Sequence, residues 1–204
     1  MISINSKKTG KYLILCGLLL VFIIFIPFIY QELKYFTTRP NNDMSVVIDS
    51  NKTSVTKHFI TPVDKDFSVV IPKIGVNSKV IPNVDYKNSF EYQEKLKYGI
   101  AHAKNTVFPG QIGNSFLFAH SSVDFYNAIK YNSVFYLLYK LNKNDKIYAV
   151  YKNEIYKYTV SDVKIVNEKD MQYLINNTST KTLTLMTCWP LGTNYKRLVV
   201  IATL

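Results

Sequence analysis

Cys188 is the residue of this 204-residue sequence whose type and setting first point to catalysis. It follows the apolar run LTLMT, and Trp189 and Pro190 come directly after it. Because proline cannot continue a central β-ladder, we expect the strand to end there and to leave the thiol at the edge of a sheet. The other cysteine, Cys16, lies in an apolar N-terminal run, so the two cannot form a disulfide with each other. A free thiol at a strand end is either a nucleophile or a small packing residue.

A cysteine nucleophile needs a nearby base or cation to form a useful thiolate, and His120 is the best candidate for that partner. It ends the apolar run NSFLFAH (114–120) and precedes two serines, so it too lies where a strand meets a loop. His58 lies in a polar stretch, and His102 lies in the sequence AHA, where a structural role is equally expected. For any single histidine, a capping or partly buried imidazole is the alternative.

Arg197 comes nine residues after Cys188, at the start of the last apolar run of the chain. If the strands on either side of residues 189–196 pair with each other, the guanidinium returns close to the thiol. It could then donate hydrogen bonds to a substrate carbonyl or to the oxyanion of a tetrahedral intermediate. An arginine that only faces solvent at a strand edge is the alternative.

The elements that must position these three residues are strands. From Phe67 onward, short apolar runs alternate with turn residues, which predicts an all-β barrel or sandwich with few helices. The expected strands are 67–72, 78–82, 114–120, two strands within 145–166 around a turn at Lys152-Asn153, 181–188 and 196–204. Short helical segments are expected at 91–97, 135–141 and 170–175.

Three stretches of this sequence resemble the sortase family. The string TLMTC (184–188), followed by Arg197, resembles the C-terminal signature in which TLxTC ends one strand and an arginine opens the next. The segment GIAHAKNTVFPGQIGNSFLFAHSS (99–122) resembles the stretch that leads to the catalytic histidine of the family. FSVVIPKIGVNSKVIP (67–82) is similar to the opening strands, so the resemblance extends over residues 67–204.

The resemblance implies an eight-stranded β-barrel with a few short helices, with Cys188, His120 and Arg197 as the catalytic residues in a groove at one end. It implies a cysteine transpeptidase that cleaves an LPxTG-like signal after the Thr through a thioacyl intermediate. His120 would move the proton, and Arg197 would hold the acyl group. The implied partners are secreted proteins with a C-terminal sorting signal and an amine acceptor of the cell envelope.

Weaker expectations surround these residues. Thr187 and Ala119 match the family pattern by position and are expected to bind substrate, with packing as the alternative. Asp124 lies four residues after His120 and is a weaker candidate for orienting the imidazole. No cofactor or metal is expected, because the sequence has no Cys/His cluster with zinc spacing and its acidic residues are too scattered for the calcium site of some sortases. The short chain is similar to the smaller, D- and E-like sortase classes.

Residues 12–30 form a run of nineteen residues without a charge, which as a helix spans about 28 Å, close to the thickness of a bilayer core. Lysines before this run favour a cytoplasmic N-terminus. The expected organisation is a short cytoplasmic tail (1–11), a transmembrane anchor (12–30), a polar extracytoplasmic tether (31–66) in which 46–48 could add a strand or lid, and a catalytic domain (67–204). A cleaved signal peptide is the alternative, although no small-x-small cleavage site follows the run. This organisation predicts a single-pass protein of the cell membrane with its catalytic domain outside the cytoplasm.

The charge balance is basic, with 25 Lys and Arg against 14 Asp and Glu and a formal net charge of +11. The cations are scattered and no nucleic-acid-binding motif accompanies them, so nucleic acid is not an expected partner. A solvated basic surface beside an anionic envelope explains the charge. Two other functions stay open: a cysteine peptidase that releases its product to water, and a non-catalytic tethered β-domain that binds an anionic wall polymer.

Overall fold

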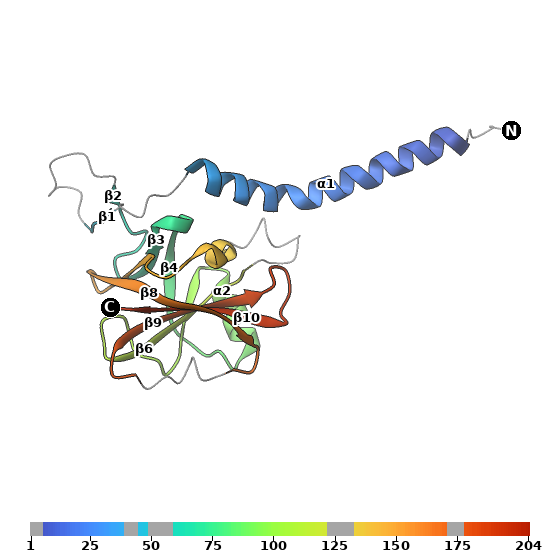
Figure 1. Cartoon of the computed structure of the whole chain (residues 1–204). Helices are drawn as coiled ribbons and strands as arrows, with labels where there is room; N and C mark the ends of the chain where they lie inside the picture. Colours follow the sequence, from blue (N-terminus) through green and yellow to red (C-terminus); the bar gives the residue numbers. More distant parts are fainter. Residues whose placement is uncertain (1–5, 39–44, 49–58, 122–132, 171–177) are drawn as a thin grey trace. The chain divides into compact units, whose positions relative to one another are not determined.

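The structure is a computed structural model that describes residues 6–38, 45–48, 59–121, 133–170 and 178–204. The chain divides into two compact units, Met1–Thr38 and Arg39–Leu204. The first unit consists of α1 (Ser6–Thr38), and the second contains a β-barrel with short helices (Figure 1). The predicted class, an all-β domain with few helices, is therefore confirmed for the second unit.

Helix α1 is longer than the segment 12–30 that was expected to be helical, because it continues at both ends through polar residues. Many of its described apolar side chains, such as those of Leu15 and Leu19, are more than half exposed. Among the residues that the structure describes, no helix combines the length and apolar character that crossing a membrane requires. The membrane anchor expected at residues 12–30 stays a prediction.

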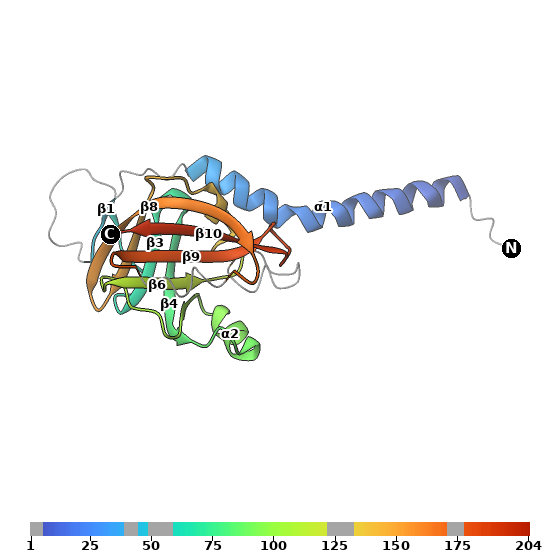
Figure 2. The same cartoon turned by 60° about the horizontal axis from the view of Figure 1, so that its bottom comes forward.

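Eight strands close into a barrel in the order β10-β8-β7-β3-β4-β5-β6-β9. In chain order they are β3 (Phe67–Ile71), β4 (Val76–Val84), β5 (Ile100–Ala103), β6 (Gly113–Phe118), β7 (Lys146–Tyr151), β8 (Glu154–Asn167), β9 (Lys181–Trp189) and β10 (Lys196–Thr203). Most neighbours are antiparallel, but β4–β5 and β6–β9 are parallel. Figure 2 shows β6, β9, β10 and β8 running side by side on one wall of the barrel.

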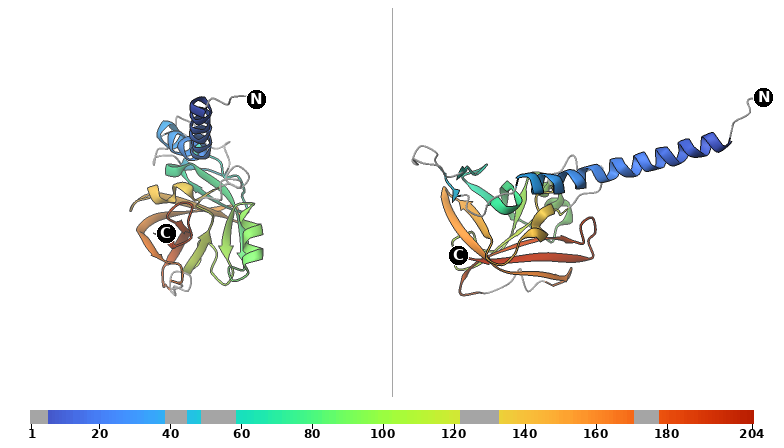
Figure 3. Two further views of the ribbon diagram at one scale, coloured as in Figure 1. Left: turned by 90° about the vertical axis from the view of Figure 1, so that its right-hand side faces the viewer. Right: turned by 45° about the horizontal axis from the view of Figure 1, so that its top comes forward.

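Short helical segments connect the strands. They are η2 (Pro72–Ile74), α2 (Ser89–Leu96) and η3 (Tyr136–Lys140). Asn88 caps α2, because its side chain accepts a hydrogen bond of 3.2 Å from the backbone N–H of Glu91. Helix α2 (green) lies on the outside of the barrel in the left view of Figure 3. Two predicted helices, near 91–97 and 135–141, thus correspond to α2 and η3, whereas the one predicted at 170–175 lies almost wholly outside the described residues.

Alternation along the strands builds the barrel interior. On β9, Leu183 and Leu185 are fully buried, and the facing residues of β10, Ala202 and Val200, are fully buried as well. The residues between them point to the opposite face of the sheet, since side chains alternate along a strand. Burial of these apolar side chains supplies the main stabilisation of the barrel and fixes the register of β9 against its neighbours.

Two short parallel strands, β1 (Ser45–Val46) and β2 (Phe59–Ile60), lie in the segment that was expected to be a polar tether. Val46 packs in an apolar cluster with Val70 and Tyr148 of the barrel, and Ile60 joins the same cluster. Part of the segment 31–66 therefore folds against the barrel. The sequence had indicated a short strand near Val46 as one option.

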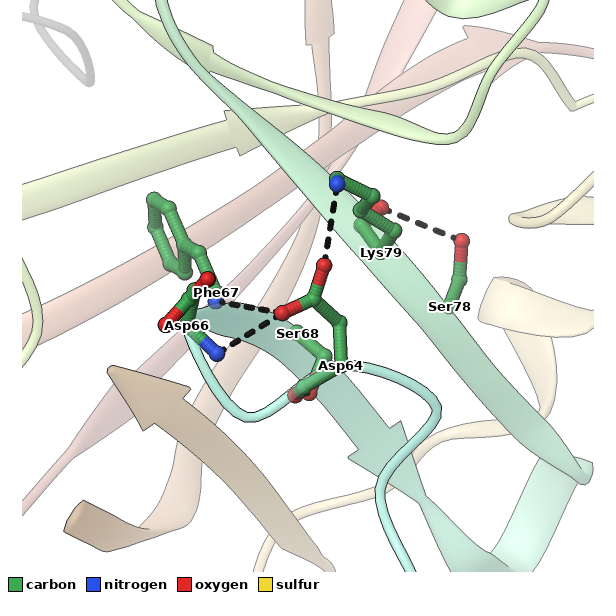
Figure 4. Close-up of polar contacts among 6 residues, drawn as sticks. All are labelled: Asp64, Asp66, Phe67, Ser68, Ser78 and Lys79. Atoms are coloured by element: carbon green, nitrogen blue, oxygen red, sulfur yellow. Dashed lines mark hydrogen bonds and ion pairs between the residues drawn. The ribbon is translucent and has the colours of Figure 1, made fainter. Parts of the chain in front are cut away.

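The entry of the chain into the barrel is organised by Asp64 (Figure 4). One carboxylate oxygen accepts hydrogen bonds from the backbone N–H groups of Asp66 (2.7 Å) and Phe67 (3.3 Å), and the other forms an ion pair of 3.0 Å with Lys79 of β4. Burial alone would raise the pKa of Asp64, but the hydrogen bonds from Lys79 and from the two backbone groups outweigh it and lower that pKa. This carboxylate thus fixes the start of β3 against β4.

Candidate active site

Cys188 and Arg197 face each other across the two last strands. In the antiparallel register of β9 and β10, Arg197 is the direct partner of Cys188, and Leu198 is the partner of Thr187. Strand β9 ends at Trp189, directly before Pro190, as the missing N–H of proline predicts. The thiol is half-buried. The pairing of β9 with β10 brings Arg197 back beside it, as the sequence predicted.

His120 reaches the same place along a third strand. β6 and β9 are parallel neighbours, and their register ends with Phe118 opposite Met186. The pairing continues past this point, because the backbone N–H of Ala119 donates a hydrogen bond of 3.2 Å to the carbonyl of Met186. Extrapolating this register by two residues beyond its last pair, Phe118 and Met186, puts His120 level with Cys188. Adjacent strands lie about 4.8 Å apart, so the imidazole and the thiol belong to neighbouring positions on one face.

Thr187 and Ala119 hold these two strand ends together. The hydroxyl of Thr187 donates a hydrogen bond of 2.7 Å to the carbonyl oxygen of Ala119. Both residues are buried and alternate with the catalytic candidates, so they face the barrel interior. Their position favours a structural role over the contact with substrate expected from the sequence, and the substrate-binding role stays a prediction.

Burial acts on the thiol and the imidazole in opposite directions. It raises the pKa of Cys188, since it disfavours the thiolate, and the positive charge of Arg197 lowers this pKa while the negative charge of Glu168 raises it. Burial also lowers the pKa of His120, since it disfavours the imidazolium. Burial thus disfavours the charged form of each group, the thiolate of Cys188 and the imidazolium of His120.

Several acceptors hold the guanidinium of Arg197. Its Nη1 donates to the carbonyl oxygens of Asn194 (2.8 Å) and Lys196 (3.0 Å), and its Nη2 donates to Oε1 of Glu168 at 2.9 Å. The sequence reasoning missed Glu168, which follows the last residue of β8. Knowledge of the β8–β10 pairing would have pointed to Glu168, because Arg197 lies opposite Val166 in that pairing. That pairing joins strands that are distant in sequence, so no local pattern shows it.

His102, the other histidine of the barrel, has no part in this site. It is fully buried in β5, its ring stacks on Phe108 with centroids 4.6 Å apart, and its Nδ1 accepts a 3.3 Å hydrogen bond from the backbone N–H of Asn83. Nε2 lies 3.1 Å from the carbonyl oxygen of Val107 and donates to it, because Nδ1 is already an acceptor. His102 is thus a structural, neutral imidazole. Asp124, the weaker candidate for orienting His120, lies outside the described residues.

Within the described ranges, no three His, Cys, Asp or Glu side chains gather as they would around a metal ion. The groups that the register brings together are the thiol, the imidazole and the guanidinium. A thiol can attack a carbonyl carbon, an imidazole can carry the proton, and a guanidinium can stabilise the oxyanion. These are the parts that acyl transfer through a thioester needs.

Comparison with known proteins identifies the class of this barrel. A family model of the sortase domain matches residues 69–204, which is more than half of the chain. The chain belongs to the sortase family, whose members are cysteine transpeptidases. Over 221 aligned positions it is 28% identical to sortase A of Listeria monocytogenes, and the alignment covers 97% of this chain and 91% of that protein.

Solved structures support the same fold. Sortase C-1 of Actinomyces oris superposes with a TM-score of 0.58 at 23% identity, covering 85% of this chain and 96% of that one. A sortase D5 transpeptidase of Clostridium perfringens superposes with a TM-score of 0.55 at 25% identity, covering 71% of this chain and 81% of that one. The sortase-type eight-stranded barrel that the resemblance implied is therefore confirmed.

Proposed function

We propose that this chain cleaves an LPxTG-like sorting signal and joins the new carboxyl end of the surface protein to an amine of the cell envelope. The observation that carries the proposal is the convergence of Cys188, His120 and Arg197 at neighbouring ends of β9, β6 and β10. No long loop is needed to bring the three groups together, because strand register does so. Family membership supplies the reaction class.

In the first half of the reaction, the Cys188 sulfur attacks the carbonyl carbon of the signal threonine. The thiol proton passes to His120, and Arg197 donates hydrogen bonds to the oxygen that gains negative charge. The bond between this carbonyl and the following nitrogen then breaks, and His120 returns the proton to the leaving amine. A thioester between the substrate and Cys188 remains.

In the second half, the acceptor amine attacks the thioester carbonyl. His120 takes a proton from the incoming nitrogen, the carbon–sulfur bond breaks, and the thiolate regains its proton. The products are an amide bond and a free Cys188. Because the amide formed replaces the amide cleaved, the transfer needs no cofactor and no external energy source.

The test is to mix the full-length chain in detergent with LPxTG and LPxTA peptides, with and without an amine acceptor. Mass spectrometry should detect a thioester on Cys188 and, with the amine present, a ligated product. Release of the peptide to water alone, even at high amine concentration, would instead support a cysteine peptidase. A Cys188 that forms no adduct with any such peptide would leave a binding domain as the better reading.

The proposal includes an N-terminal anchor at residues 12–30 that holds the catalytic unit outside the cytoplasm. Its support is the sequence: a run without charges that follows Lys7, Lys8 and Lys11. Changing Leu18 and Leu19 to Arg would place two charges in that run, which is costly inside a bilayer. The variant should leave the membrane fraction for the soluble fraction. Retention of both forms after an alkaline wash would contradict the anchor.

The subclass in this proposal follows the sequence resemblance to the smaller, D- and E-like sortases. The predicted partners are secreted proteins that end in the signal. A panel of peptides that differ at each position of the signal, used in the same assay, measures the preference directly. Equal turnover of unrelated peptides would contradict recognition of an LPxTG-like signal.

A further inference from the structure

The guanidinium of Arg197 is held by three described acceptors. The contacts among the described residues use both hydrogens of Nη1, for the carbonyls of Asn194 and Lys196, and one hydrogen of Nη2, for the carboxylate of Glu168. Arginine has five N–H donors. Those contacts leave the Nε–H and the second Nη2–H as the donors for an acyl oxygen at Cys188.

Glu168 is the one charged partner among these acceptors. The Arg197 side chain is 15% exposed and the Glu168 side chain is 55% exposed. Arg197 has therefore lost most of its water, and the carboxylate replaces part of that hydration, whereas Glu168 keeps much of its own. A hydrogen bond between two charged groups is stronger and more directional than one to a neutral carbonyl, so this contact contributes most to the orientation of the guanidinium.

The sheet fixes where Glu168 lies. β8 pairs with β10 so that Asn167 is opposite Lys196 and Val166 is opposite Arg197. Glu168 is the next residue after this pairing, so its backbone position is set by the ladder. The same ladder sets Arg197 against Cys188 on its other edge. Arg197 and Cys188 thus come from the neighbouring strands β10 and β9, and Glu168 comes from the residue that directly follows β8, the other neighbour of β10.

We infer that Glu168 is a positioning residue that holds the guanidinium of Arg197 in the orientation needed to meet the acyl oxygen at Cys188. This inference rests on the proposed function, because it assigns Glu168 a task in the same reaction. Glu168 does not touch the reacting atoms; it acts through Arg197. Without this carboxylate, the described partners of the guanidinium would be two neutral carbonyls, those of Asn194 and Lys196.

The carboxylate has a second, measurable effect on the site. Among the described residues, the charges that act on the Cys188 thiol are those of Arg197 and Glu168, with opposite signs. Burial is the main cause of the raised pKa of the thiol; loss of the Glu168 charge removes a smaller contribution in the same direction and leaves the charge of Arg197 uncompensated. The thiolate should then form at lower pH even if turnover falls.

Glu154 provides a matched control, because it is the first residue of β8, the strand that Glu168 follows, and its carboxylate accepts a 2.5 Å hydrogen bond from the Tyr156 hydroxyl. The experiment compares Glu168→Gln, Glu168→Asp and Glu154→Gln in the full-length chain. All forms carry Cys16→Ser, so that Cys188 is the only thiol. The probes are iodoacetamide, whose reaction with the thiol is followed against pH, and the LPxTG peptide with an amine.

The expected result has two parts. Glu168→Gln lowers kcat by about tenfold with a smaller change in KM, because the interaction lost is made in the transition state, and it moves the alkylation midpoint to lower pH. Glu168→Asp, which keeps the charge, restores the midpoint and part of the turnover, and Glu154→Gln behaves as the wild type. Unchanged or increased kcat in Glu168→Gln, or a midpoint that does not move, would overturn the inference.

The alkylation arm separates this inference from the proposed function. It needs no sorting signal, so it reports on the Glu168–Arg197–Cys188 arrangement even if the peptides are not substrates. If the wild type forms no thioester with any peptide and Glu168→Gln still shifts the midpoint, the proposed function fails and the electrostatic arrangement stands. If the wild type ligates peptides and neither readout responds to Glu168→Gln, the positioning role alone fails.

Discussion

Arg197 of β10 lies directly opposite Cys188 of β9 in an antiparallel ladder, so their separation is set by sheet geometry. Opposite residues in such a ladder have Cα atoms about 4.5 to 5.5 Å apart. The connection between the two strands can vary without changing this distance. A chain that keeps the β9–β10 register therefore keeps its guanidinium beside its thiol.

Replacing Cys188 with Ala should abolish thioester formation and reduce ligation by more than about 10⁴-fold, because no other group can attack the carbonyl. The free energy of unfolding should change by less than about 1 kcal/mol, since the thiol is only half-buried and its loss leaves a small cavity. Mass spectrometry and urea unfolding measure the two quantities. Cys16→Ser, the change at the other cysteine, is the control and should ligate normally. Ligation by Cys188→Ala would remove the thiol from the mechanism.

Arg197→Lys should lower kcat/KM by about 10²-fold. The planar guanidinium donates to Asn194, Lys196 and Glu168 and still has N–H groups left for the acyl oxygen. An ammonium keeps the charge but cannot make all of these contacts at once. The thioester and ligation assays measure the loss at each half of the reaction. Lys181→Gln, at the exposed start of β9, is the control for a lost surface cation. Activity near wild type in Arg197→Lys would exclude a bidentate role.

Local patterns in the sequence predicted the parts of the fold that depend on local physics. The turn at Lys152-Asn153 adopts positive φ at both residues, as a two-residue hairpin requires, and it joins β7 to β8 where the sequence placed it. The strand at Phe67 and the end of β9 at Pro190 followed from apolar runs and from the missing N–H of proline. Those signals act on neighbouring residues, so they can be read without knowing the fold.

Elements that depend on distant partners were harder to find. β5 has only four residues, and its sequence IAHA carries no clear alternation; it is a strand because it pairs with β4 and β6. The partnership of Glu168 with Arg197 likewise depends on the β8–β10 register. The position of His120 beside Cys188 also follows from the parallel β6–β9 register. The family resemblance, rather than any spacing in this chain, first connected those two residues.

The pH dependence of kcat/KM should be bell-shaped and broad. On the acid limb the imidazole of His120 is already protonated and cannot accept the thiol proton. Because burial lowers the pKa of His120 below its ordinary value of 6.5, this limb should lie below pH 6.5. Burial raises the pKa of Cys188, so the alkaline limb should lie above the ordinary range of a thiol. Rates measured with a fixed peptide from about pH 5 to 10 test both limbs. An acid limb centred above pH 6.5 would contradict the burial of His120 as its cause.

The free energy of unfolding should fall as the pH falls below 6.5, partly because of His102. Burial lowers the pKa of His102 below 6.5, against a weaker effect of the hydrogen bond to Val107. Below pH 6.5 the unfolded chain therefore binds a proton at this imidazole more readily than the folded chain does. The contribution of His102 to the free energy of unfolding is present above pH 6.5 and is lost as the pH falls toward the lower pKa of the folded state. Urea unfolding at several pH values should show a smaller loss for His102→Gln than for the wild type. An equal loss in both would assign the dependence to other groups.

Gly110 is a site where any side chain should destabilise the barrel. A Cβ added there would lie 2.1 Å from the ring of Tyr156, and its φ of +87° is one that L-residues rarely adopt. The ring of Tyr156 cannot move away freely, because its hydroxyl donates a hydrogen bond to Glu154. The backbone of Gly110 is held as well, because its N–H donates a 2.9 Å hydrogen bond to the Tyr158 hydroxyl. Gly110→Ala should therefore cost about 2 kcal/mol or more in the free energy of unfolding.

Gly75→Ala separates the cost of the backbone at such a site from the cost of the clash. Gly75 has a φ of +65°, but a Cβ there would meet no atom within 4 Å. The substitution should therefore lower the free energy of unfolding by about 1 kcal/mol, because only the left-handed backbone conformation disfavours alanine there. Urea unfolding of the two variants should thus rank Gly110→Ala as the more damaging. Equal losses would mean that Tyr156 moves aside and that backbone strain alone sets the cost at both turns.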